Sequence, residues 1–384
     1  MSRPADKQFR QVFFSCFQER VSIMGKKREL SRREFMMSSA LLSMGIAAPT
    51  VLKLVEHRRV SAQDKPLRAA MSNAGLAVTW CAQGKDTAEM WGDFLGVEIV
   101  WFDGALDTAI QRGVVDQIAT QDWDFVAIQP LSIGSLIEPL QALIDAGVPV
   151  VDLDTLFAPF PQMDEMGILT FIAPDNVFMS EAVVEEVFRK MGGAGKVAHT
   201  WGSVGHTGAQ GRGQGFYNVL ARYPDIELVD DQPGDWDVTK VASIWESVLN
   251  RHPDLKGGFL HNDDMALAAS QVVQNAGLSE QVAIGGIDAM SPAIDAVISG
   301  RLVATARNSA PRVHGNGVLA GWVAASIGVD AARASIPTFI LADGPAITSS
   351  IDSNPDLAAE PWKLRGYGRS TAEGLRWLQD QLTF

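Results

Sequence analysis

Cysteine is nearly absent from this chain, which has only Cys16 and Cys81 among its 384 residues. Cys16 lies in an N-terminal segment that we expect to be removed, so an intramolecular disulfide is excluded in the mature chain. A protein exported already folded needs no disulfides. The lack of cysteine therefore excludes a disulfide-stabilised fold without excluding a location outside the cytoplasm.

Positive charge is scarce in the body of the chain. Of the 32 Lys/Arg and 45 Asp/Glu residues, residues 1–62 hold 12 and 5, which leaves 20 and 40 from residue 63 onward. Nucleic-acid binding needs clustered cations that replace the counterions of phosphates. The acidic body therefore argues against a nucleic-acid partner, and the basic head has a separate task.

Patterns typical of enzymes and metal sites are also missing. No Ser/His/Asp grouping, cysteine nucleophile or carboxylate pair stands out. His199, His206 and His261 lie in separate segments without the spacing of metal ligands. The glycines around 211–215 superficially resemble the dinucleotide fingerprint of an oxidoreductase, but Phe216 stands where its third glycine belongs. We therefore expect no metal, no cofactor and no enzymatic activity.

The basic head contains an arginine pair, Arg32-Arg33, directly before an apolar stretch over 35–55 that is rich in Ser, Gly and Ala. Small residues at 60–62 end this segment, as at a signal cleavage site. The segment as a whole resembles a twin-arginine export signal. We expect residues 1–62 to be an N-terminal extension and signal, read by the twin-arginine export machinery, and the mature protein to be periplasmic. An uncleaved membrane anchor is the alternative, because a run of this length can span a bilayer. Whether translation starts at Met1 or Met24 stays open.

From Pro66 onward, short β-rich runs alternate with amphipathic stretches of helical periodicity. This alternation predicts an α/β fold with parallel sheets, and the number of strands suits two doubly wound lobes. The predicted strands are Leu67 to Met71, Val97 to Phe102, Phe125 to Gln129, Val148 to Leu153, Ile168 to Ile172, Lys196 to Trp201, Ile226 to Asp230, Gly258 to His261, Val282 to Ile287 and Leu302 to Ala306.

Polar side chains follow most of these strands at their carboxyl ends, where open α/β sheets bind ligands. Carboxylate, amide and guanidinium groups dominate, and such planar groups donate and accept hydrogen bonds in the pairs that a buried hydroxyl needs. The positions are Ser72-Asn73, Asp103-Gly104, Gln129-Pro130, Asp154-Thr155, Trp201-Gly202, Asn262-Asp263, Asp288-Ala289 and Arg307-Asn308.

Three motifs occur in order in the second half of the chain: HNDDMAL at 261–267, IGGID at 284–288 and GRLVAT at 300–305. On these motifs the sequence resembles the ribose/galactose-type periplasmic binding proteins, over residues 66 to about 345. The resemblance implies the type I periplasmic binding protein fold: two Rossmann-like doubly wound lobes joined by a three-strand hinge. These close on a sugar and deliver it to the membrane permease of an ABC transporter.

The expected organisation follows from this resemblance. The N-terminal lobe takes residues 66–174 and 309–337, the C-terminal lobe takes 175–308 and 338–349, and 350–384 form a C-terminal extension for which we have no functional account. We expect a monomer.

The resemblance also implies a set of ligand-binding residues. Arg212 is similar to the family's guanidinium clamp, Trp236 to its aromatic platform and Asp154 to its first-lobe acid. The position after that acid holds Thr155 where the family has arginine, which leaves the identity of the sugar or sugar alcohol open. The expected site is Asn73, Trp80, Asp154, Arg212, Trp236, Asn262, Asp288 and Asn308.

Several of these residues have structural alternatives. Asn262 suits an N-terminal helix cap before Asp263, and Asp288 suits a cap for a helix near Pro292. Trp236 suits a packed core. Arg212 opposite Asp154 and Asp288 makes a roughly charge-balanced site, which favours a neutral ligand.

Two other functions use the same lobes. A lactose-type repressor needs a basic helix-turn-helix at its N-terminus, where this chain has the predicted export signal. A sugar or autoinducer receptor that feeds a signalling protein remains an alternative to transport.

Overall fold

The computed structural model describes residues 32–44, 46, 50, 51, 54, 66–342 and 346–348. Helix α2 (Arg32–Ser43) contains the arginine pair. The predicted cleavage site at 60–62, the alternative start at Met24 and the extension over 350–384 lie outside the described residues. Within the described part of the chain, no helix has the length and apolarity needed to cross a membrane.

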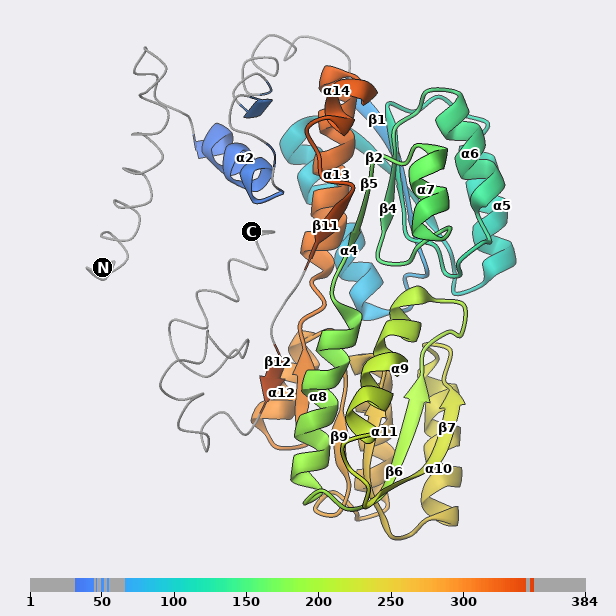
Figure 1. Cartoon of the computed structure of the whole chain (residues 1–384), viewed down its shortest axis with the longest axis vertical. Helices are drawn as coiled ribbons and strands as arrows, with labels where there is room; N and C mark the ends of the chain where they lie inside the picture. Colours follow the sequence, from blue (N-terminus) through green and yellow to red (C-terminus); the bar gives the residue numbers. More distant parts are fainter. Residues whose placement is uncertain are drawn as a thin grey trace, which may run out of the picture. The chain divides into compact units, whose positions relative to one another are not determined.

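The first lobe is built on a six-stranded sheet with the order β11-β5-β4-β3-β1-β2, in which every paired strand is parallel (Figure 1). Helices cover both of its faces, with α4 and α13 on one and α5, α6 and α7 on the other. Its elements are β1 (Leu67–Asn73), α4 (Thr79–Leu95), β2 (Val97–Asp103), α5 (Thr108–Ile118), β3 (Phe125–Ile128), α6 (Ile137–Asp145), β4 (Val150–Leu153), α7 (Phe160–Met166), β5 (Thr170–Ala173), α13 (Ala310–Ile327), α14 (Val329–Arg333) and β11 (Phe339–Leu341).

The second lobe has a similar sheet with the order β12-β10-β9-β8-β6-β7, in which β12 is antiparallel to β10 and the other pairs are parallel. Helices α8 and α9 pack together beside the sheet, and α10, α11 and α12 form the other layer. Its elements are α8 (Asn176–Lys190), β6 (Gly195–Trp201), α9 (Thr207–Leu220), β7 (Ile226–Pro233), α10 (Val238–Arg251), β8 (Leu255–Leu260), α11 (Asp263–Asn275), β9 (Ala283–Gly285), α12 (Ser291–Ile298), β10 (Ala304–Ala306) and β12 (Ala346–Thr348).

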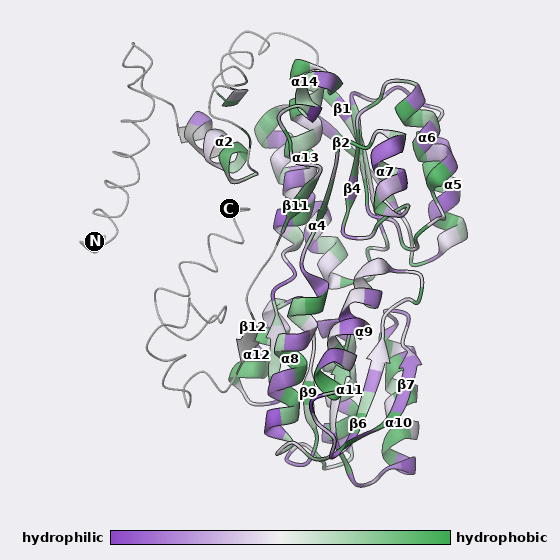
Figure 2. Ribbon diagram, viewed as in Figure 1, coloured by the Kyte–Doolittle hydropathy of each residue, from purple (hydrophilic) through white to green (hydrophobic). Residues whose placement is uncertain are grey.

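Each sheet has a point where the strand order reverses, between β1 and β3 in the first lobe and between β6 and β8 in the second. Chains leaving neighbouring strands there turn to opposite faces, which opens a crevice at the carboxyl ends. The covering helices are amphipathic, with green apolar and purple polar residues on α5, α6 and α10 in Figure 2. Their apolar sides complete two separate cores, one around Val126 and one around Val197.

Helix α11 shows how local sequence sets an element. It begins after Asn262, whose side chain accepts a hydrogen bond from the Met265 backbone N–H at 2.9 Å. Such a cap stabilises a helix by about 1 kcal/mol. The helix stops before Gly277, whose φ of 73° lies in the left-handed region that glycine adopts without strain.

All ten predicted strands are present, which confirms the predicted α/β class with its two parallel sheets. Strands β11 and β12 were not predicted, because three residues are too few to produce a periodic signal. The placement of 338–349 in the C-terminal lobe was wrong for β11, since Phe339 to Leu341 pair with β5 of the first sheet. The last connection between the lobes therefore follows β11.

Candidate functional site

A cavity of about 30 Å³ lies at the carboxyl ends of the strands of both sheets. Residues from both lobes line it: Ala74, Val78, Trp80, Cys81, Leu106, Gln129, Asp154, His206, Arg212, Trp236, Asn262, Asp288 and Asn308.

The backbone around the cavity is strained. Among the described non-glycine residues with positive φ, four line the cavity: Leu106 at 55°, Asp154 at 58°, Trp236 at 62° and Asp288 at 122°. Such conformations cost about 1 to 3 kcal/mol each and persist where the surroundings impose them, which is most often at binding sites. The fold therefore holds these side chains in place at the expense of backbone strain.

Arg212 is 3% exposed and contacts four residues, one on α8 and three on the loops that follow β8, β9 and β10. Its Nε donates to the Asn176 side chain at 2.9 Å, its Nη1 donates to the His261 carbonyl, and its Nη2 lies 3.6 Å from Asp288. With its amide oxygen facing the guanidinium, Asn308 accepts from Nη2 at 3.0 Å. The guanidinium is thus fixed in orientation before any ligand arrives.

The charges at the site nearly cancel. Burial raises the pKa of Asp288 well above its usual range, although Arg212 opposes the shift. Burial also acts to raise the pKa of Asp154, but His206, Arg212 and Gln129 outweigh it and lower that pKa. The ionised Asp154 carboxylate thus offsets the positive charge of Arg212, and such a site favours a neutral ligand.

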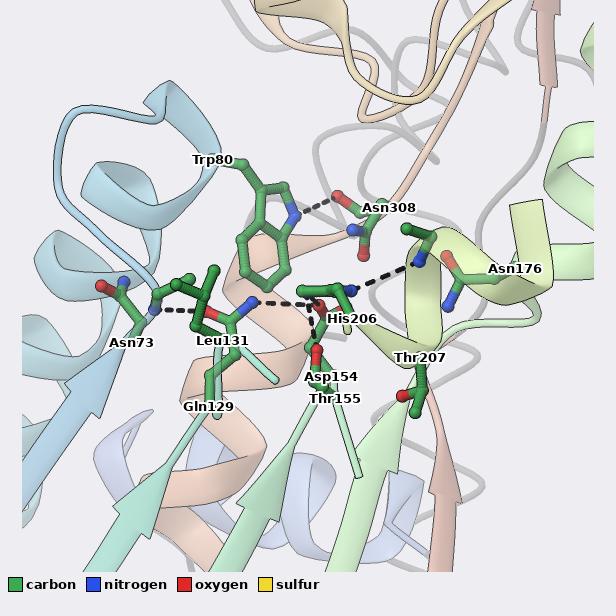
Figure 3. Close-up of polar contacts among 12 residues, drawn as sticks. Asn73, Trp80, Gln129, Leu131, Asp154, Thr155, Asn176, His206, Thr207 and Asn308 are labelled. Atoms are coloured by element: carbon green, nitrogen blue, oxygen red, sulfur yellow. Dashed lines mark hydrogen bonds and ion pairs between the residues drawn. The ribbon is translucent and has the colours of Figure 1, made fainter. Parts of the chain in front are cut away.

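Two indole rings border the cavity. The Trp80 Nε1 donates to the Asn308 carbonyl at 2.9 Å, and Figure 3 shows this ring leaning across the site. The Trp236 ring lies edge-on to His206, with centroids 5.4 Å apart. It also rests on Gly202, where a Cβ would come within 2.0 Å of the indole. Aromatic faces of this kind pack against the C–H groups of a sugar.

The structural alternatives for two predicted residues are now decided. Asn262 caps α11 through its Oδ1 and also lines the cavity, so the cap is compatible with the predicted ligand contact. Asp288 does not cap α12, because the residue at the cap position is Met290 and no side-chain cap bond is made there. Asp288 is 3% exposed and faces Arg212.

Asn73 is the predicted residue that the cavity does not include. It is fully buried, and its Nδ2 donates to the Cys81 carbonyl at 2.8 Å. This bond ties the amide nitrogen to the first turn of α4, while Oδ1 is buried without a hydrogen-bond partner among the described residues. Asn73 is therefore not part of this cavity lining, and its Nδ2 supports α4; a direct ligand contact at Asn73 stays a prediction.

Six lining residues lie outside the predicted set, and three of them, Gln129, His206 and Cys81, carry polar groups; the other three are Ala74, Val78 and Leu106. Gln129 follows β3 directly, so its position was a usable signal, but its contact with Asp154 required the fold. His206 had been considered only as a metal ligand. Cys81 lines the cavity with a thiol whose pKa burial raises, so it is a neutral wall. In the described ranges, no group of three or more His, Cys, Asp or Glu side chains is arranged to hold a metal ion.

His314 of α13 supports Trp80 from behind, with ring centroids 5.0 Å apart. Its Nδ1 donates to the Ala310 carbonyl at 3.1 Å. Gly84 makes room for it, because a Cβ there would lie 2.3 Å from the imidazole. Burial lowers the pKa of His314 to about 4, although the bond to Ala310 opposes the shift. The ring is thus neutral in the folded protein near neutral pH.

We expect the free energy of unfolding to fall by about 3 kcal/mol through His314 as the pH drops from about 6.5 to about 4, because the unfolded chain binds the proton first in this window. His314→Asn keeps a donor for Ala310 and does not titrate there, so its pH dependence should be flatter. Urea unfolding at pH 7.5, 5.5 and 4.5 measures both proteins. Equal pH slopes would contradict the assignment.

A family model described as a periplasmic binding protein domain matches residues 69–331. The chain is similar to the ribose import binding protein of Escherichia coli, with 28% identity over 234 residues that cover 61% of this chain and 76% of the relative. It is similar to a xylitol-binding protein of Mycolicibacterium smegmatis, with 25% identity over 291 residues that cover 73% and 76%.

Solved structures agree with these similarities. An ABC transporter solute-binding protein from Agrobacterium vitis, bound with α-D-tagatopyranose, superposes with a TM-score of 0.67 and 26% identity, covering 76% of this chain and 98% of that one. One from Mycobacterium smegmatis with bound glycerol gives 0.62 and 26%, covering 72% and 92%.

Proposed function

This chain belongs to the periplasmic binding protein family, and we propose that it captures a neutral monosaccharide or sugar alcohol for the membrane permease of an ABC transporter. The family consists of binding proteins rather than enzymes. We accordingly propose binding without chemistry.

The observation that carries this proposal is the arrangement around the cavity: one fixed guanidinium, one ionised carboxylate and two indole rings. A sugar presents apolar C–H faces, which the indole rings match, and a ring of hydroxyls, which the guanidinium and the carboxylate match. The near-cancellation of Arg212 by Asp154 disfavours an anion. The similar proteins named for ribose and xylitol, and those bound to tagatopyranose and glycerol, support the same ligand class.

The proposed mechanism is closure of the lobes around the ligand. In the described arrangement the lobes already touch at their rims, where Thr79 of α4 bonds Asp264 of α11 at 2.7 and 2.8 Å. A second contact joins the loop after β3 to the loop after β6, where the Ile133 N–H donates to the Gly205 carbonyl at 3.0 Å. A ligand that contacts both lobes stabilises this closed state by its additional contacts, and the permease then meets a closed surface.

Thermal-shift screening followed by calorimetric titration tests the proposal. The purified mature protein is titrated with D-ribose, D-allose, D-tagatose, myo-inositol, xylitol and glycerol. A ligand present at 100 times its Kd should stabilise the fold by about 2.7 kcal/mol through mass action. Absence of both heat and stabilisation with every compound would contradict the proposed ligand class.

We further propose that the protein is exported through the twin-arginine route to the periplasm and acts there as a monomer. The periplasmic location of the family supports the destination, and the Arg32-Arg33 pair supports the route. Replacing both arginines by lysine should leave precursor in the cytoplasm, as seen by fractionation and immunoblotting. Unchanged secretion would contradict the route.

A further inference from the structure

His206 is held in one tautomer by the helix that it caps. Its Nδ1 accepts a hydrogen bond from the Ala209 backbone N–H at 3.3 Å, at the N-terminus of α9. A ring nitrogen that accepts carries no proton, so in the neutral ring the proton is on Nε2. Nε2 is therefore available as a donor toward the first lobe.

That nitrogen points at the loop after β4. It lies 2.6 Å from the Thr155 Oγ1 and 3.3 Å from the Asp154 Oδ2. The same Oδ2 accepts from Gln129 at 3.0 Å. Figure 3 shows these side chains converging on the carboxylate from two lobes. Gln129 thus donates to Oδ2, and His206 Nε2, whose shorter contact is to Thr155, lies beside the same oxygen and restrains it.

The other oxygen of Asp154 has no such support. Oδ1 is buried and has no hydrogen-bond partner among the described residues, on a side chain that is 2% exposed and lines the cavity. An unpaired oxygen of a buried carboxylate is costly, and a hydroxyl in the cavity would satisfy it.

We propose that His206 is a positioning residue that determines specificity: by holding Oδ2 of Asp154 across the two lobes, it leaves Oδ1 to accept from one hydroxyl of the ligand. This inference rests on the proposed function. It adds that the protein discriminates against compounds without the hydroxyl that donates to Asp154 Oδ1. Compounds with a methoxyl or a carboxylate in place of that hydroxyl should be rejected as well.

A purely structural role for His206 makes a different prediction. Thr207, the next residue, also joins the lobes, because its Oγ1 accepts from the Leu156 N–H at 3.0 Å. Thr207 is not part of the cavity lining and does not bond Asp154. If His206 only fastens the lobes, removing either bond should weaken the binding of every ligand by the same factor.

The experiment compares His206→Asn with Thr207→Val. Asparagine still caps a helix but is too short to reach Asp154. The probes are D-ribose, D-allose and xylitol, and every monodeoxy analogue of the one that wild-type protein binds most tightly. A hydrogen bond to a charged group contributes about 10- to 100-fold in affinity. We expect one deoxy analogue to bind wild-type protein more weakly than its parent compound by this factor. The ratio of the two dissociation constants should fall toward one in His206→Asn and should persist in Thr207→Val.

His206→Gln provides a rescue, because its amide reaches Asp154 and should restore part of the ratio. It also keeps the inference testable if His206→Asn does not fold, as judged by circular dichroism and melting temperature. Binding by wild-type protein with an unchanged ratio in the His206 variants would overturn this inference and leave the proposed function intact. Failure of wild-type protein to bind any probe would overturn both.

Discussion

Replacement of Arg212 by alanine is expected to weaken binding of the sugar or sugar alcohol by at least about 100-fold. The guanidinium is buried and oriented, so it offers the ligand charge-assisted hydrogen bonds worth about 1.5 to 3 kcal/mol each. Its removal also leaves Asp288 without its facing cation. Calorimetric titration with the tightest-binding probe measures the loss. Arg212→Lys keeps the charge without the planar fork and should fall between wild type and alanine.

Arg222 is a matched control just beyond the same helix. Its side chain is 51% exposed and pairs with Glu185 at 2.9 Å, far from the cavity lining. Arg222→Ala should leave affinity unchanged and alter stability by less than about 1 kcal/mol. A folded Arg212→Ala protein with wild-type affinity would show that the guanidinium does not contact the ligand. Because Arg212 also bonds Asn176 and His261, its variants need a melting curve beside each titration.

Replacement of Trp236 by alanine is expected to reduce affinity by about 30-fold, or about 2 kcal/mol. The indole supplies apolar area against the ligand's C–H face, and alanine cannot exclude water from that side of the cavity. Trp236→Phe should retain much of the affinity. Gly202→Ala gives an independent route to the same effect, because the new methyl group would lie 2.0 Å from the indole and must displace it.

Trp245 serves as the control for a general loss of packing in the same lobe. It is fully buried and its Nε1 donates to the Thr200 Oγ1 at 3.1 Å, but it does not line the cavity. Trp245→Phe should lower the melting temperature without changing ligand affinity. If Trp236→Ala and Trp245→Phe lower both quantities in parallel, the indole of Trp236 acts as core packing and the platform role fails.

The fold was predictable because its signals are local. Strands buried on both faces appear as short apolar runs, and capping residues such as Asn262 mark where a helix starts. Local signals do not predict strand β11. Its three residues contain no period, and its partner, β5, is more than 160 positions earlier in the chain.

The site was predictable to the extent that residues after parallel strands must lie near one another. Asp154, Asp288 and Asn308 follow β4, β9 and β10, and the structure brings them to one cavity. Side-chain direction was not predictable in the same way. Asn73 follows the same rule of position, yet its amide turns to the Cys81 carbonyl.

The sequence alone determined that this protein has two α/β lobes with parallel strands and with polar groups at the strand ends. Hydropathy periods and motif spacing are read within short stretches of sequence, so no tertiary structure is needed to see them. Tertiary structure alone decided how those groups are used. His206 meets Asp154 across 52 positions and two lobes, and Arg212 meets Asp288 across 76. Such contacts depend on where distant backbones come to rest and on which oxygen is already paired, and neither is encoded in a local pattern.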